Sequence, residues 1–190
     1  MKHISVFCGA SCGSAPEYVA AAEQLGKLFA QSNIGLVYGG AKVGLMGTIA
    51  DSVLNAGGYV TGVIPEHIVK HEIAHHGVSD LRIVRSMHER KAMMAEMSDG
   101  FIAMPGGLGT LEEVCEILTW VQLGLHAKPI GFLNVNHFYA KLFSFLDHAV
   151  SEQFLKKEFR DNIYSSESPA ELLRMLSGHQ KTVMSRYGEV

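Results

Sequence analysis

The sequence lacks the features that would assign it at once to several large classes of protein. No stretch reaches the roughly 18 to 20 consecutive apolar residues that a membrane-spanning helix needs. The formal net charge is -3, so the basic excess of a nucleic-acid-binding or anionic-membrane-binding surface is also missing. We therefore expect neither a nucleic acid nor a membrane among the partners of the protein.

Cysteine is scarce, and the pattern of a secretion signal is missing. Residues 1–9 continue directly into a strand pattern, without the basic, apolar and small-residue regions of a signal peptide. Cys8, Cys12 and Cys115 make an odd number of cysteines, and the first two lack the spacing of a redox or zinc pair. Reduced thiols in the cytoplasm fit this usage best, so we predict a cytoplasmic protein.

What the sequence does contain is a regular alternation of strand and helix patterns. No linker, repeat or low-complexity segment divides the 190 residues, so we expect a single domain over residues 1–190. Short runs rich in β-branched residues predict strands at residues 3–8, 34–38, 59–64, 81–85, 100–104, 129–133 and 162–164. Longer helical stretches predict helices at residues 16–31, 45–56, 87–98, 110–124, 137–149 and 169–176. This order predicts an α/β fold, a Rossmann-like, doubly wound parallel sheet with helices on both faces.

Glycine is plentiful, with 20 residues, and it is concentrated in three turns that follow predicted strands. The turns span residues 9–14, 39–47 and 105–110. Glycine lets the backbone approach a ligand closely, and the N–H groups at the start of the following helix suit a phosphate. Glycines also form tight turns without any ligand, but in parallel α/β sheets ligands bind at this edge. Three such turns therefore predict a site for a phosphorylated ligand.

The best-known nucleotide motifs are not complete in any of these turns. None of them contains a full G-x-G-x-x-G, and G-x-x-x-x-G-K-[ST] does not occur. Because these patterns carry the phosphate contacts of dinucleotide-binding enzymes and of P-loop proteins, their lack disfavours an NAD site and an NTPase.

A zinc-binding pattern competes with the phosphate site. Residues 71–75 match H-E-x-x-H, which on a helix places two zinc ligands on one face beside a glutamate base. The helix could extend only over about residues 66–76, and no third ligand follows at a recognisable spacing. His67, His71 and His75 could equally form a polar helix face. We therefore expect no metal ion and no cofactor.

Charged residues follow two of the predicted strands. Arg90 and Lys91 open a helix, where cations oppose the helix dipole, so they suggest an anionic partner, although solvated helix charges are the alternative. Thr110 and Glu113 fit a capping box, with Thr110 as the N-cap and Glu113 returning to its amide. Because a carboxylate beside a phosphate is unfavourable, a catalytic role is the alternative for Glu113.

Residues 105–113, Pro-Gly-Gly-Leu-Gly-Thr-Leu-Glu-Glu, match the PGGxGTxxE motif of the "Lonely guy" family, the cytokinin riboside 5′-monophosphate phosphoribohydrolases. The chain resembles this family again, in the same order, at residues 7–11, 38–40, 44–47, 63–65, 87–91 and 119–124. Many bacterial members have been labelled lysine decarboxylases. Nothing in the sequence marks the lysine that a pyridoxal phosphate enzyme needs for its Schiff base, so we do not expect that reaction.

The resemblance implies hydrolysis of the N-glycosidic bond of a cytokinin-type or purine nucleoside 5′-monophosphate such as AMP, which gives the free base and ribose 5-phosphate. It implies that Arg90 and Glu113 are the catalytic pair. A carboxylate fits this chemistry, because cleavage builds positive charge on the sugar. Ala10 and Ala41 depart from the family pattern, where many members have serine and glycine. The substrate-binding residues that the resemblance implies are Ser11, Gly39, Gly40, Met87, Lys91, Gly106, Gly107, Gly109 and Thr110.

Two further expectations concern the alternative function and the partners. A non-catalytic carrier of a nucleotide or of the molybdenum cofactor, with the same fold, is the alternative, but a carrier has no need of both Arg90 and Glu113. The helices predicted over residues 87–98 and 110–124 have apolar residues around much of their circumference, which predicts a second surface to be buried. We therefore expect a homodimer or a dimer-based higher oligomer, with these helices at or near the contact.

Overall fold

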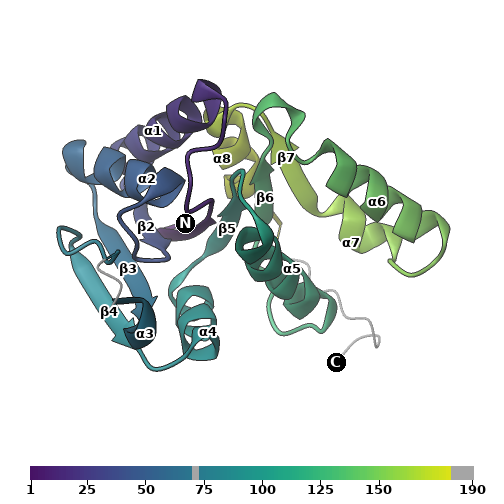
Figure 1. Ribbon diagram of the computed structural model, residues 1–190. Helices are drawn as coiled ribbons and strands as arrows, with labels where there is room; N and C mark the ends of the chain where they lie inside the picture. The colour runs from purple at the N-terminus through teal and green to yellow at the C-terminus, as the bar shows by residue number, and fades with distance from the viewer. Residues whose placement is uncertain (70–72, 181–190) are drawn as a thin grey trace.

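Seven short strands form a parallel sheet in the computed structural model, which describes residues 1–69 and 73–180 (Figure 1). The strands are β1 (His3–Phe7), β2 (Gly35–Tyr38), β3 (Val60–Pro65), β4 (Asp80–Val84), β5 (Gly100–Ala103), β6 (Ile130–Leu133) and β7 (Ile163–Ser166). Their order across the sheet is β4-β3-β2-β1-β5-β6-β7. The order reverses between β1 and β5, so the crevice in which such sheets bind ligands lies at the carboxyl ends of these two strands.

The central strands are buried on both sides. Every residue of β2, β3, β5 and β6 is buried, as the continuous apolar runs of these strands predict. The edge strands β4 and β7 keep partly exposed residues instead. In the register of the centre, Ile4 of β1 pairs with Leu36 of β2 and with Gly100 of β5. The predicted doubly wound parallel sheet is therefore confirmed.

Helices cover both faces of this sheet. The core of one face includes Leu25, Ile49 and Leu172, from α1, α2 and α8. The core of the other face includes Met94 and Ile117, from α4 and α5, and α6 packs against its margin. The helices are α1 (Pro16–Gln31), α2 (Gly44–Asn55), α3 (Glu66–Val69), α4 (Met87–Met97), α5 (Leu108–Gln122), η1 (Val135–His137), α6 (Ala140–Ser151), α7 (Lys157–Asp161) and α8 (Pro169–Ser177). Of the helices in the described ranges, none combines the length and apolarity that crossing a bilayer requires.

The predicted strands and long helices all form within a few residues of their expected bounds, but the helix that the zinc pattern would need over residues 66–76 does not. It ends as α3 at Val69, and Ala74 is extended, in an antiparallel bridge with Ala41. The bridge is closed by hydrogen bonds from Lys42 N to Ile73 O and from His75 N to Gly40 O, each 2.8 Å long. The short elements η1 and α7 were not predicted, because segments of this length show no helical periodicity.

Candidate active site

A cavity of about 360 Å³ lies at the carboxyl ends of β1, β2 and β5. Its wall includes Gly9 after β1, Gly39 after β2 and Gly107 after β5, which come from the three glycine turns. A second cavity of about 510 Å³ adjoins it and shares Gly9, Ala10 and Gly107 with it. The three turns that the sequence singles out therefore meet around one hollow at the reversal point of the sheet.

Hydrogen bonds join the three turns into one unit. Gly9 N donates to Pro105 O over 3.0 Å, and Leu45 N donates to Gly9 O over 3.1 Å. Gly44 has a φ of 58°, and a Cβ there would lie under 3.0 Å from the backbone of Ala10. A side chain at Gly44 would thus both strain the backbone and separate two of the turns.

The helices that begin at these turns have no side-chain caps. The N-cap residues of α1, α2 and α5 are Ala15, Val43 and Gly107, and none of them gives a side-chain hydrogen bond to the helix. By contrast, α4 and α8 are capped by Ser86 and Ser168. The first N–H groups of α5 are therefore available to an anion in the cavity, which Gly107, Gly109 and Thr110 of the same turn line.

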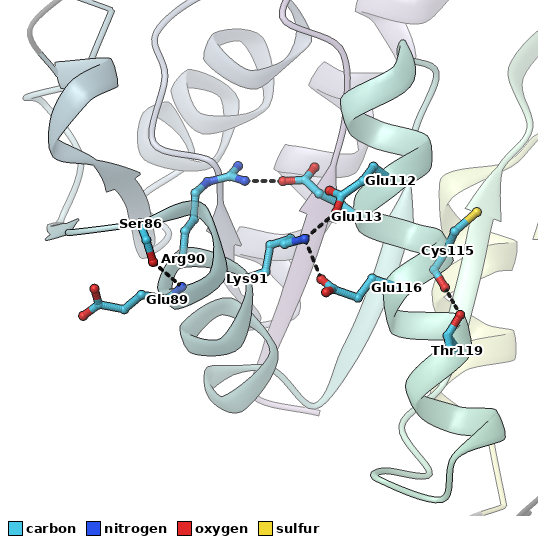
Figure 2. Close-up of polar contacts among 9 residues, drawn as sticks. All are labelled: Ser86, Glu89, Arg90, Lys91, Glu112, Glu113, Cys115, Glu116 and Thr119. Carbon is cyan, nitrogen blue, oxygen red and sulfur yellow. Dashed lines mark hydrogen bonds and ion pairs between the residues drawn. The ribbon is translucent and has the colours of Figure 1, made fainter.

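Arg90 enters the cavity from α4. Ser86 fixes the start of this helix, because its hydroxyl accepts from Glu89 N over 3.1 Å, while the Glu89 carboxylate accepts from Arg85 N over 2.8 Å. Arg90 is 7% exposed. Its Nε donates to Val63 O of β3 over 3.0 Å, and its Nη1 donates to the Glu113 carboxylate (Figure 2). A strand carbonyl and a carboxylate thus hold the guanidinium in one orientation.

Because Gly39 has no side chain, there is room beside it for the guanidinium of Arg90. A Cβ at position 39 would lie under 3.0 Å from Nη2 of Arg90. The same Cβ would also come to 3.1 Å from Met46 Sδ. The glycine at the end of β2 is therefore required by the position of the guanidinium. Its φ is not in the left-handed region.

Glu113 meets Arg90 from α5, and the capping box predicted for this helix is wrong. α5 begins at Leu108 with Gly107 as its N-cap, so Thr110 lies within the first turn. The Glu113 carboxylate is directed at Arg90 and away from the helix start (Figure 2). The extended Gly107 begins the helix three residues before the expected cap, which leaves Glu113 free for the cavity.

Burial and neighbouring charges set the protonation states of Glu113 and Cys8 in the cavity wall. Burial raises the pKa of the Glu113 carboxyl above its ordinary value, and the positive charge of Arg90 opposes this rise. Burial also raises the pKa of the Cys8 thiol far above its ordinary value, and the charge of Glu113 adds to the effect. Cys8 therefore stays a thiol, and the cavity offers a carboxylate–guanidinium pair without a thiolate nucleophile.

The remaining residues that the resemblance implies fall into two groups. Met87 lines the first cavity, and Ser11 and Gly106 line the second. Gly40, with a φ of 75°, lies behind the first cavity against β3, and Lys91 turns away from it towards α5. The sequence did not single out Ile68 of α3 and Ile73, which also line the first cavity and come from the chain between β3 and β4. No local pattern marks these two side chains.

The structure does not support the helical zinc pattern. His75 follows the bridge residue Ala74, and its Nε2 lies 2.9 Å from an Asp51 carboxylate oxygen on α2. His71 and Glu72 lie outside the described residues. Over residues 1–69 and 73–180, no group of three His, Cys, Asp or Glu side chains is arranged to hold a metal ion.

Comparison with known sequences gives one family. The family model described as "Possible lysine decarboxylase" matches residues 46–176. The cytokinin riboside 5′-monophosphate phosphoribohydrolase LOG1 of Arabidopsis thaliana is 46% identical over 193 residues, which cover 100% of this chain and 91% of the relative. The cytokinin riboside 5′-monophosphate phosphoribohydrolase of Rhodococcoides fascians is 50% identical over 163 residues, which cover 85% of this chain and 82% of the relative.

Comparison with solved structures gives the same architecture. The molybdenum cofactor binding protein of Rippkaea orientalis superposes with a TM-score of 0.71 at 24% identity, covering 92% of this chain and 94% of that protein. The Moco carrier protein of Chlamydomonas reinhardtii gives a TM-score of 0.68 at 22% identity, covering 93% and 98%. At this level of identity the likeness shows a shared fold.

Proposed function

The chain belongs to the family of the cytokinin riboside 5′-monophosphate phosphoribohydrolases, and we propose that it hydrolyses the N-glycosidic bond of AMP-like and cytokinin-type nucleoside 5′-monophosphates. The products are the free base and ribose 5-phosphate. One observation carries the assignment of the site. The buried Arg90–Glu113 pair and the uncapped start of α5 face the same cavity.

The nucleotide enters this cavity phosphate first. The 5′-phosphate binds the N–H groups of Gly107 and Gly109 at the start of α5, with the Thr110 hydroxyl beside them. The ribose then lies over Glu113, further along the same helix. The base extends towards Ile68 and Ile73.

Glu113 and Arg90 act on the anomeric carbon. As the bond between C1′ and the base nitrogen breaks, positive charge builds on the sugar, and the Glu113 carboxylate stabilises it. The same carboxylate orients a water, whose oxygen bonds to C1′ while its proton passes to the departing base. Arg90 keeps Glu113 ionised despite its burial. The Nη2 of Arg90, at the cavity wall beside Gly39, donates to a sugar hydroxyl.

The test is a hydrolysis assay with three substrates and one variant. AMP and N6-isopentenyl-AMP release free base, measured by liquid chromatography, while adenosine is a poor substrate because the start of α5 loses its anion. Glu113→Gln keeps the shape but removes the charge, so turnover falls about 10²-fold or more. Glu96→Gln, on the exposed face of α4, is the matched control and keeps full activity. Binding of AMP without release of adenine by the wild-type protein would indicate the carrier function instead.

We also propose that the active form is a cytoplasmic homodimer. An apolar cavity of about 210 Å³ lies between α5, α6, α7 and β7, with Leu118, Val121 and Leu146 in its wall. Phe145 on α6 is 63% exposed, and α6 has no buried residue. Figure 1 shows α6 and α7 set apart from α5 at one side of the sheet. A second copy that covers α5 would bury these side chains.

A further inference from the structure

Lys91 makes its contacts on the helix that carries Glu113. Its side chain is 8% exposed, and its Nζ contacts the carboxylate of Glu112 and lies 2.9 Å from that of Glu116. These two glutamates are four residues apart, so they share one face of α5. Figure 2 shows the ammonium between them, while the neighbouring Arg90 reaches Glu113. Two consecutive cations of α4 thus meet three carboxylates of α5.

This arrangement fixes the rotation of α5 relative to α4. Glu113 follows Glu112 directly, so its side chain points about 100° further around the helix. Holding Glu112 and Glu116 on Lys91 therefore directs Glu113 towards Arg90. Lys91 itself does not belong to the wall of the first cavity, whereas Glu112 does.

The same contacts set the charge around Glu113. The negative charge of Glu112 raises the pKa of the Glu113 carboxyl, and the positive charge of Lys91 lowers it. Burial lowers the pKa of Lys91, but its hydrogen bonds to Glu112 and Glu116 outweigh this effect and leave the pKa above its ordinary value. The lysine is therefore charged at neutral pH. Among the described residues, the titratable groups that act on Glu113 include Arg90 and Lys91 from α4, Glu112 on α5 and Cys8 after β1, while Glu116 pairs with Lys91.

We propose that Lys91 is a positioning residue for the glycosidic hydrolysis and does not bind the nucleotide. It orients Glu113 by holding the two flanking carboxylates of α5, and it neutralises them so that Glu113 stays ionised. The inference rests on the proposed function, because it assigns Lys91 a part in the work of Glu113. It also replaces the substrate contact that the family resemblance implies for this lysine.

The kinetic test compares Lys91→Met with Lys91→Arg. The methionine variant keeps the unbranched apolar stem of the side chain but loses the ammonium and its charge. We expect its kcat to fall about tenfold or more, because Glu113 is misplaced. Its KM for AMP should change by less than about threefold, and the acid limb of its pH–rate profile should move to higher pH. Lys91→Arg keeps the charge and restores much of the activity. Lys27→Met, at an exposed position of α1, controls for the change in net charge.

A measurement without substrate separates this inference from the proposed function. With ¹³C-labelled glutamate, carbon NMR follows the titration of Glu113, assigned by its loss in Glu113→Gln. Lys91→Met should raise the apparent pKa of Glu113 by about half a unit or more, and Lys91→Arg should not. The inference is overturned if the methionine variant raises KM for AMP with kcat unchanged, or if the Glu113 pKa stays at its wild-type value. If the wild-type protein is inactive on AMP but Lys91→Met still raises the pKa of Glu113, only the proposed function is refuted.

Discussion

Gly39→Ala perturbs the proposed catalytic pair, Arg90 and Glu113, without replacing either residue. The added Cβ would lie under 3.0 Å from Nη2 of Arg90, a separation that real Cβ atoms essentially never show. The backbone at position 39 accepts alanine, because its φ is not in the left-handed region. The clash therefore falls on the guanidinium. The neighbouring Met46 thioether, at 3.1 Å, can move aside.

The size of the effect follows from how Arg90 is held. To reach ordinary van der Waals contact with the new methyl group, Nη2 must move by about 1 Å. The guanidinium is planar and rigid, so a movement at Nη2 also disturbs the donations from Nε to Val63 O and from Nη1 to Glu113. A displacement of about 1 Å in a catalytic group costs about 10²-fold in rate. The weakened contacts should cost about 1–3 kcal/mol of stability.

The assay measures kcat/KM for AMP and the thermal midpoint of each variant. We expect Gly39→Ala to lower kcat/KM about 10²-fold and to lower the midpoint by about 2–4 °C for each kcal/mol lost. Gly178→Ala is the control, because a methyl group on this C-cap glycine would meet its nearest neighbour, Arg174 O, at 3.5 Å, and the φ of the glycine is -84°. In an Arg90→Ala background, Gly39→Ala should cost no further activity. Wild-type activity in Gly39→Ala, or independent effects of the two changes, would refute the steric argument.

Three further predictions concern the metal, the amino terminus and the oligomer. Exhaustive chelation should leave hydrolysis of AMP unchanged, and a loss of activity that zinc restores would contradict this. Asp99 accepts hydrogen bonds from Lys2 N and His3 N; burial raises its pKa, but these bonds outweigh burial and leave it lowered. The stabilisation is therefore present above the unfolded-state pKa and is lost as the pH falls through the lowered folded-state pKa. Asp99→Asn should thus cost less than about 1 kcal/mol at pH 7 and progressively less at acid pH, measured by urea unfolding. Light scattering at micromolar concentration should give at least twice the 20.7 kDa of one chain, and Phe145→Asp should reduce it to one chain.

The parts of the site that the sequence predicts are those whose physics is local. A glycine turn after a strand depends only on backbone freedom and on the helix that follows, so turns such as residues 105–107 could be located from pattern alone. Helix α5 shows where this approach fails. Thr110 and Glu113 have the spacing of a capping box, but Gly107 starts the helix earlier and a partner from another helix takes the carboxylate. Spacing along one helix does not reveal a competing long-range contact.

The same limit explains why the contacts of Arg90 could not be predicted from the sequence. Its position at the start of α4 indicates an anionic partner, and Glu113 is one, but the sequence does not show which atoms hold the guanidinium. The hydrogen bond from Nε ends on Val63 of β3, while Glu113 stands on the helix that follows β5. In the sheet, β2 and β1 lie between these two strands.

Arg90 therefore spans the glycine turns that follow the two intervening strands. Gly39 is the residue that leaves room for it to do so. The proposed catalytic geometry then depends on the order of four strands, and β3, which has no residue in the cavity wall, acts on it through a single carbonyl oxygen. A change that shifts β3 should for this reason impair hydrolysis even though β3 lies two strands away from the reversal point, where we propose that the phosphate binds.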